Sequence, residues 1–402
     1  MINIIVFDIM NHLTHDIVEI EGIWSRKMKI EMMDCLIRNA TRSIFINFGY
    51  VVGGVDAKYV LDQLIAKKEN NPSIRIVICL IFVQTSYEED YMILLRNTLD
   101  DVFVLYHGII RTENFPYFHL SVCHHKCALF DDKELIIGSS NYKDGFMYPD
   151  DVDYVDNREN FKNKLNHIFH LNFITKKFVE FDVYIKFDRE MVELFNLFYK
   201  VISGITIQKC DLVGYNFKME MTGINYGRKY PIIDILRESK ESVDIICFHL
   251  WPRGDFYDAL VDLLKRGVRV RFIIPSAESI TTYFFYIVCM YHIYRLSHFG
   301  QIEYSAFCVG GSVHIKMIVS DNSRLMISSA NYNEKSLNKK TESELWCDIW
   351  GDKTEKIISR YNDWIEKIDF QKYRRGGLFG WLGDAMYRGT MRVVSGFIEW
   401  MF

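Results

Sequence analysis

The chain has 402 residues, of which 49% are apolar and 25% charged, and its formal net charge is −4. That length exceeds what one ordinary hydrophobic core accommodates, so two globular domains are expected. The acidic balance excludes a global field that would draw the protein to nucleic acid or anionic lipid, and any polyanion must meet a local basic site.

The cysteines and the first residues indicate the compartment. Nine cysteines, an odd number, lie largely in apolar runs such as residues 77–79 and 245–247, which favours buried reduced thiols over a disulfide framework. The apolar stretch 1–7 meets Asp8 at once and carries no basic residue, so we expect a strand there rather than a signal peptide or a spanning helix. The sequence therefore predicts a protein that faces the cytosol and is not secreted.

The first half reads as alternating helices and strands that lead to a histidine and a lysine. His124 and Lys126, two residues apart, are expected to project from one face of a short strand. A turn at residues 131–133 and a strand at 134–138 then bring Ser139 and Asn141 to the same edge. The preceding elements are expected to be a helix at 24–40, a strand at 43–48, a helix at 58–68 and a buried strand at 74–82.

After this motif the first half contains a polar acidic segment, 148–153, and a helix-like stretch, 160–170, which resemble an insertion over the site. The acidic residues could form a calcium loop, but the pattern lacks the expected glycine and glutamate, which favours a solvated loop. A strand at 181–185 and a helix at 191–201 are predicted to complete the half.

The same order returns in the second half. A helix at 232–239, a strand at 243–249, a helix at 255–265 and a strand at 268–275 precede His314 and Lys316, which are followed by Ser329 and Asn331. Repeats of this length indicate duplication of a whole α/β domain. We expect two similar lobes, each a mixed β-sheet flanked by helices, related by a pseudo-twofold axis. The predicted parts are lobe one at 1–206, a linker at 207–229, lobe two at 230–370 and a tail at 371–402.

The repeated residues suit metal-independent displacement at phosphorus. Two opposed imidazoles around one tetrahedral anion could attack and protonate in line, while the lysines and amides stabilise charge on the equatorial oxygens. A carboxylate behind each imidazole would fix its tautomer, and we expect Asp182 and Glu344 in that role. Zinc binding by Cys123, His124, His125 and Cys127 is disfavoured because neighbouring strand residues point to opposite faces.

Both strings resemble the HxKxxxxD…GSxN signature of the phospholipase D superfamily, and residues 181–185 and 330–336 look most like its cardiolipin synthase-type branch. The second copy departs from the signature at Ser328, where glycine is usual, and Lys335 stands where arginine is usual. The resemblance implies a phosphohistidine intermediate and no cofactor, with His124 attacking. It implies catalysis by His124 and His314, phosphate binding by Lys126, Lys316, Asn141 and Asn331 with help from Ser139 and Ser329, and structural roles for Asp131 and Asp321.

The substrate is inferred from weaker features. The acidic balance argues against nucleic acid, and the tail carries Lys372, Arg374 and Arg375 ahead of Trp381 and Trp400, a composition that suits a bilayer interface or a docked helix. The apolar run 280–294 is short for a membrane span and is expected to be a buried helix. We therefore expect a phospholipase D or phosphatidyltransferase that binds the membrane peripherally from the cytoplasmic side. A nuclease of the same superfamily and a catalytically idle membrane-remodelling scaffold are the alternatives, and the sequence specifies no oligomeric state.

Overall fold

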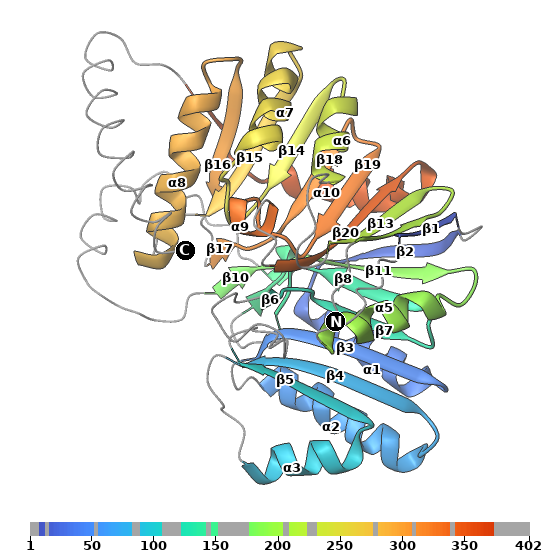
Figure 1. The fold of residues 1–402 in the computed structure, drawn as a ribbon. Helices are drawn as coiled ribbons and strands as arrows, with labels where there is room; N and C mark the ends of the chain where they lie inside the picture. The colour runs from blue at the N-terminus through green and yellow to red at the C-terminus, as the bar shows by residue number, and fades with distance from the viewer. Residues whose placement is uncertain are drawn as a thin grey trace, which may run out of the picture.

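The protein is described by a computed structural model. It covers residues 8–12, 16–51, 55–82, 89–106, 122–141, 146–151, 177–203, 209–222, 231–275, 280–307, 311–337 and 342–373. The expected strand at 1–7, the stretch 160–170 and residues 374–402 of the tail lie outside this range. Within it the chain forms two lobes, the first below the second in Figure 1.

The first lobe is built on a seven-stranded mixed sheet. Its order is β2 (Ile17–Ile23), β11 (Asp182–Phe187), β8 (Glu134–Gly138), β7 (Cys127–Phe130), β3 (Ser43–Val51), β4 (Arg75–Phe82) and β5 (Asp101–Tyr106). Strands β3, β4 and β5 are parallel, whereas β7, β8 and β11 are antiparallel to their neighbours. The flanking helices are α1 (Arg26–Asn39), α2 (Val55–Asn70), α3 (Glu89–Thr98) and α5 (Val192–Ile202).

Alternation along the strands divides the buried side chains of this sheet between two faces. Ile44 and Ile46 of β3 pack with α1 and α2, whereas Phe45 between them packs with α5. The Phe45 face continues into the second lobe, because one buried cluster also contains Met317, Ile327 and residues of a second-lobe helix, α10 (Glu355–Ile365). The two lobes therefore share a hydrophobic core.

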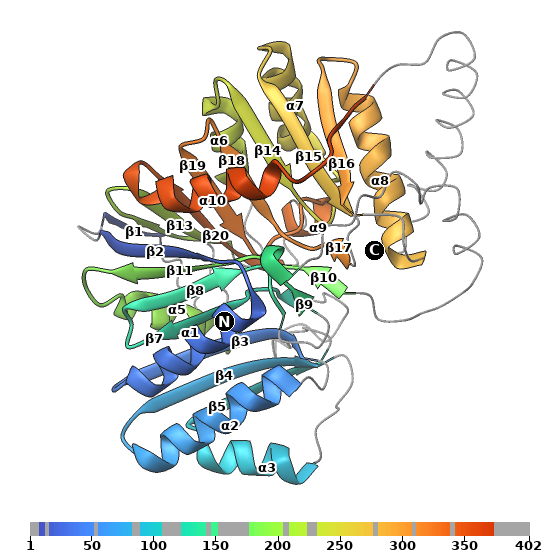
Figure 2. The same cartoon turned by 180° about the vertical axis from the view of Figure 1, so that it is seen from behind.

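The second lobe carries a larger sheet. Its order is β1 (Asp8–His12), β12 (Lys209–Val213), β13 (Phe217–Thr222), β20 (Glu342–Trp350), β19 (Arg324–Ser328), β18 (Met317–Ser320), β14 (Ser242–Ile246), β15 (Arg269–Pro275), β16 (Ile302–Phe307) and β21 (Gln371–Lys372). Besides α10, its helices are α6 (Pro231–Glu238), α7 (Gly254–Lys265), α8 (Ile280–Leu296) and α9 (Glu334–Leu337). In Figure 2, α10 lies on the near face of this sheet and α7 on the far face.

The mixed-sheet, two-lobe fold predicted from the repeat is confirmed, with one difference in the part expected to link the lobes. Segment 207–229 is more than a linker, because it contributes β12 and β13 to the second sheet. In addition, β1, near the N-terminus, pairs with β12 in that sheet rather than joining the first lobe. The alternation Lys209 to Val213 is short and includes charged residues, which masked the strand in the sequence. As expected, α8 packs into the lobe through Cys289 and Ile293. None of the described helices is long and apolar enough to cross a membrane.

Short strands cross between the lobes in a reciprocal way. β6 (Val122–Cys123), just before His124, pairs in parallel with β20 of the second lobe. In the mirror arrangement, β17 (Gly311–Val313), just before His314, pairs in parallel with β10 (Lys177–Val179) of the first lobe, which also pairs with β9 (Phe146–Met147). Each histidine is therefore delivered to the lobe interface next to a strand from the opposite half.

Candidate active site

Each motif histidine lies against a glutamate from the other lobe. His124 Nδ1 is 3.0 Å from Glu344 Oε1, and His314 Nδ1 is 2.7 Å from Glu180 Oε1. Both glutamates are fully buried, and His124 is 7% exposed. Because a carboxylate engages Nδ1 of each ring, Nε2 is the nitrogen left to face a substrate, and in His314 that Nε2 also lies 2.9 Å from Lys316 Nζ.

The expectation for Glu344 matches this geometry, whereas the one for Asp182 is corrected by it. Asp182 contacts Lys29, 2.7 Å from Oδ2, rather than a histidine. The carboxylate beside His314 belongs to Glu180, two residues earlier. The error arose because Glu180 lies between β10 and β11, only two residues before Asp182, the first residue of β11, and the sequence alone does not fix the register.

The backbone shows that Glu180 and Glu344 are equivalent. Phe181 N donates to Ser139 Oγ at 3.1 Å, and Leu345 N donates to Ser329 Oγ at 3.0 Å, so the residue after each glutamate binds the motif serine of its own half. Each half contains a glutamate followed directly by an apolar residue, Glu180-Phe181 and Glu344-Leu345. This repeated dipeptide is the sequence feature that identifies Glu180 as the counterpart of Glu344. The longer insertion in the first half obscured it.

The motif lysines fold back on their own histidines. Lys126 Nζ donates to His124 O at 2.7 Å, and Lys316 Nζ donates to His314 O at the same distance. Residues 124–126 lie between β6 and β7 rather than inside a strand as expected, because the chain there passes from the second sheet to the first. Both ammonium groups are nevertheless buried beside the imidazoles.

The motif asparagines lie in close-packed surroundings in both halves. A Cβ on Gly49 would come within 2.6 Å of Asn141 Oδ1 and 3.1 Å of Lys126 Cγ, so Gly49, at φ 62°, leaves the room that Asn141 occupies. In the second half, Asn331 Oδ1 is buried and accepts no hydrogen bond from the described residues. Oδ1 accepts hydrogen bonds, so its contact would be a donor, whereas the Nδ2 of the same amide is the atom that could donate to an anion.

The motif serines brace the strands that carry the glutamates. Ser139 Oγ donates to Phe181 O at 3.2 Å, and Ser329 Oγ donates to Glu344 Oε2 at 2.5 Å. Both serines are fully buried. Their contacts in this structure therefore hold the glutamates and their strands in place.

The motif aspartates lie at the far ends of the hairpins. Asp131 and Asp132 have φ of 48° and 57°, and Asp321 and Asn322 have φ of 50° and 49°, so each pair occupies the left-handed centre of a tight turn within a three-residue hairpin loop. Each aspartate also accepts backbone N–H groups ahead of a central strand. Those donors are Thr41, Arg42 and Ser43 for Asp131, and Lys240, Glu241 and Ser242 for Asp321. These contacts fit the structural role implied by the resemblance.

Burial and crowding of positive charge dominate the electrostatics. Burial, and then the charges of Lys316 and Lys126, hold the pKa of His314 well below 6.5. Burial lowers the pKa of Lys316 to about 7, although the negative charge of Glu180 acts in the opposite direction. Burial also raises the pKa of Glu180 well above 4.5. His125, which lies near Phe198, has its pKa lowered to about 3 by burial, so it is a neutral core residue. An anion bound here would stabilise the protonated forms of His314 and Lys316.

Aromatic rings line the second lobe's side of the site. Phe248 lies with its ring 5.0 Å from that of His314, and His249 stacks on Phe285 at 3.8 Å. Phe248 lies two residues beyond Ile246, which pairs with Met317, and Gly49 lies two residues beyond Asn47, which pairs with the equivalent Cys127, so Gly49 corresponds to Phe248 in the first lobe. The motif repeat did not predict this asymmetry, because these residues lie outside the repeated strings.

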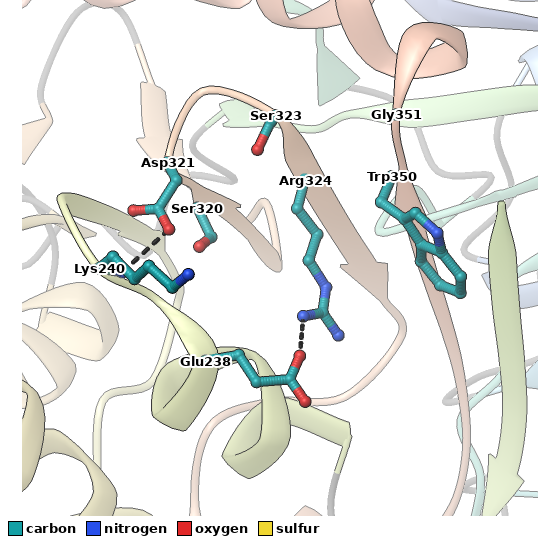
Figure 3. Close-up of a pocket in the computed structure, with 8 residues that line it drawn as sticks. All are labelled: Glu238, Lys240, Ser320, Asp321, Ser323, Arg324, Trp350 and Gly351. Atoms are coloured by element: carbon teal, nitrogen blue, oxygen red, sulfur yellow. Dashed lines mark hydrogen bonds and ion pairs between the residues drawn. The ribbon is translucent and has the colours of Figure 1, made fainter.

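Metal-binding groups and pockets were also sought in the described part of the chain. The described residues contain no group of three or more His, Cys, Asp or Glu side chains that could hold a metal ion. A pocket of about 600 Å³ sits at the hairpin end of β18 and β19, opposite the end that leads to His314 (Figure 3). Its lining residues are Glu238, Lys240, Ser320, Asp321, Ser323, Arg324, Trp350 and Gly351.

Comparison with known proteins agrees with the fold and the repeated site. The family model described as "Cardiolipin synthase, PLD-like domain" matches residues 33–171 and again 232–368. The chain therefore belongs to the phospholipase D superfamily, in its cardiolipin synthase-like branch. No curated protein matches the sequence.

Two solved structures have a similar fold at low sequence identity. Phosphatidylserine synthase from Haemophilus influenzae Rd KW20 is 12% identical, with a TM-score of 0.62 over 88% of this chain and 87% of that one. Polyphosphate kinase from Porphyromonas gingivalis is 9% identical, with a TM-score of 0.52 over 86% of this chain but only 46% of the kinase. Nuc, a phospholipase D family member from Salmonella typhimurium, is 21% identical over 36% of this chain and 88% of Nuc, with a TM-score of 0.27.

Proposed function

We propose that this protein is a phospholipid phosphodiesterase, either a phospholipase D or a phosphatidyltransferase, that works through a covalent phosphohistidine. The observation that carries the proposal is the pair of buried His–Glu contacts, each made between the two lobes and each accompanied by a buried lysine. Two nucleophilic or acidic imidazoles beside fixed cations are the groups that displacement at a phosphodiester requires.

The reaction divides into two displacements. His124 Nε2 attacks phosphorus, the phosphorus–oxygen bond to the alcohol breaks, and His314 gives its proton to the departing oxygen. His314 then removes a proton from water or an acceptor alcohol, whose oxygen attacks phosphorus and breaks the phosphorus–nitrogen bond to His124. The lysines and the amides of Asn141 and Asn331 stabilise the charge on the remaining oxygens.

The acid role of His314 requires its pKa to rise when substrate binds. In this structure burial and Lys316 hold that pKa well below 6.5. A phosphodiester monoanion beside the ring supplies the opposite charge, which stabilises the imidazolium and raises the pKa. The proton on His314 is therefore taken up together with the anionic substrate.

A lipid phosphodiester is favoured over nucleic acid by three observations. The net charge of −4 provides no overall attraction for a nucleic acid. The matching family model is the cardiolipin synthase type, and a phosphatidylserine synthase has a similar fold. The aromatic side of the site, formed by Phe248, His249 and Phe285, also provides apolar contact area.

Substrate preference is tested by offering the purified protein fluorescent phosphatidylglycerol or phosphatidylcholine and, separately, single-stranded DNA, all with EDTA present. We expect lipid turnover that EDTA does not abolish, and its loss in His124→Ala and in His314→Ala. Cleavage of DNA without lipid turnover would replace this proposal with the nuclease alternative. Inactivity on both substrates would favour the membrane-remodelling scaffold.

We also propose peripheral attachment to the cytoplasmic face of a membrane through the tail. Because β21 pairs with β16, a truncation should end after Tyr373 so that this strand pairing is kept. Flotation with liposomes should recover less of the truncated protein than of the full chain, while turnover of a detergent-solubilised lipid is unchanged. Equal flotation would assign the tail to packing or partner binding instead.

A further inference from the structure

Next to Ser140, the residue before Asn141, lies a buried ion pair that the proposed chemistry does not use. Lys29 Nζ of α1 is 2.7 Å from Asp182 Oδ2 of β11, and their side chains are 8% and 1% exposed. Ser140 N donates to Asp182 Oδ1 at 3.2 Å, while the hydroxyls of Ser140 and Tyr148 both donate to Oδ2, the latter at 2.8 Å. We call these four residues the Asp182 cluster.

The cluster anchors the chain one residue before a phosphate-binding candidate. Ser140 stands between Ser139 and Asn141, and both its backbone N–H and its hydroxyl are held by the same carboxylate. On the other side, Asn141 packs against the space left by Gly49. The Asn141 amide therefore follows directly on a residue held by Asp182 and has Gly49 close to its Oδ1.

The second half builds the same turn without charge. Register pairs Gly138 with Asp182 in the first sheet and Ser328 with Trp346 in the second, so Trp346 takes the place of Asp182. Ala330 replaces Ser140, and Trp346 stacks on Tyr332 at 6.3 Å. An apolar arrangement is thus sufficient to fold this part of a lobe.

The difference between the ionic first half and the apolar second half indicates that the Asp182 cluster is not required for folding. A buried ion pair pays a large desolvation cost, and replacing one by apolar groups of similar size is often neutral or stabilising. The first half nevertheless retains a complete ionic cluster, with every oxygen of Asp182 hydrogen-bonded. A fixed carboxylate gives a directional hold on one peptide that apolar packing does not give.

We infer that Asp182, held by Lys29, is a positioning residue that fixes the Asn141 amide toward one oxygen of a bound phosphate group. This inference rests on the proposed function in taking the site as a phosphate site, and it makes the two halves unequal in how they hold the anion. Burial alone would raise the pKa of Asp182, but Lys29 and the hydrogen bonds from Ser140 and Tyr148 outweigh it and keep the group ionised.

The test is a double-mutant cycle read by calorimetric binding of inorganic phosphate. Lys29→Met with Asp182→Asn removes both charges at similar volume, and we expect it to weaken phosphate binding about tenfold. In an Asn141→Ala background the same pair of changes should cost nothing further, because the amide that it positions is gone. If the double variant does not fold, Ser140→Ala, which copies Ala330, is used in its place.

Two controls isolate the effect. In an Asn331→Ala background the tenfold loss should remain, because that amide belongs to the other half. Arg324→Met with Asp348→Asn removes a partly buried ion pair at the far end of β19, in which Arg324 Nη2 is 2.5 Å from Asp348 Oδ2, and should leave phosphate affinity unchanged.

The inference is overturned by an unchanged affinity in the first variant, or by an equal loss in the Asn141→Ala background. Phosphate binding needs no turnover, so the two proposals fail separately. Intact coupling without lipid hydrolysis would reject the proposed function alone, and lipid hydrolysis with additive losses would reject the inference alone.

Discussion

At the scale of single residues, the two histidines share a motif but not an environment. His314 meets the edge of Phe248, and Lys316 Nζ lies 2.9 Å from its ring nitrogens. In the first half, Gly49 holds the place that corresponds to Phe248. Two imidazoles in different surroundings can titrate apart, which division into a nucleophile and an acid requires.

The assignment of these roles gives a prediction that uses a lipid with a p-nitrophenol head group. This leaving group departs without a proton, so His314→Ala should still release p-nitrophenol in a burst and retain the lipid phosphate on His124. His124→Ala should show no burst, and on a natural head group each variant should lose about 10²-fold or more. Stopped-flow absorbance and mass spectrometry of the quenched protein make the measurement. A burst only in His124→Ala would exchange the two roles.

At the scale of elements, the pairing of β8 with β11 explains the glycine of the first motif. A Cβ on Gly138 would lie 2.0 Å from Asp182 Oδ1 and 2.4 Å from Phe181 O. The backbone there does not require positive φ, since Gly138 is not among the described glycines in that region. Ser328 is accommodated in the second half because Trp346, rather than a carboxylate anchored to the adjacent turn, pairs with it.

Exchange of the two residues should therefore be unequal. Gly138→Ser forces a side chain into the Asp182 cluster and should destabilise the protein by about 1–3 kcal/mol. Ser328→Gly, the matched change, should cost about 1 kcal/mol or less, since it removes one hydroxyl and adds backbone freedom. Urea unfolding of both variants measures this, and equal losses would contradict the steric account.

Strand register also marks how far the sequence could predict the site. The repeated motif was sufficient for the two lobes and for the approach of both histidines to their interface, because spacing in the two halves is identical there. It was not sufficient for Glu180, because a two-residue shift at the start of β11 depends on the hydrogen bond between Phe181 and Ser139. Phe248 and Gly49 could not be found either, since their proximity to the site arises from pairing between distant strands.

At the scale of the whole molecule, buried neutral histidines tie stability to pH. Burial lowers the pKa of His125 and of His292 to about 3 and holds that of His314 well below 6.5. Below pH 6.5 the unfolded chain binds protons that the folded chain does not. The stability that each contributes is therefore lost as pH falls from about 6.5 toward its folded pKa.

His292 allows this to be measured away from the site. Its ring nitrogens have no hydrogen-bond partner among the described residues, so His292→Phe removes a titration without breaking a polar contact. Between pH 6 and pH 4 the stability of the native protein should fall more steeply than that of the variant, by about 1.4 kcal/mol per pH unit. Urea unfolding across that range decides the matter, and parallel curves would mean that His292 is already protonated in the folded state.

The reciprocal contacts of the histidines constrain how the two halves can diverge. Glu344 contacts His124, and Glu180 contacts His314, so neither half contains a complete His–Glu pair of its own. A single half of this design would complete its chemistry only by associating with a second copy, at a rate set by concentration. Fusion in one chain makes that association intramolecular. It also couples sequence change in the two halves, because the histidine of one half contacts the glutamate of the other and the two positions must remain compatible.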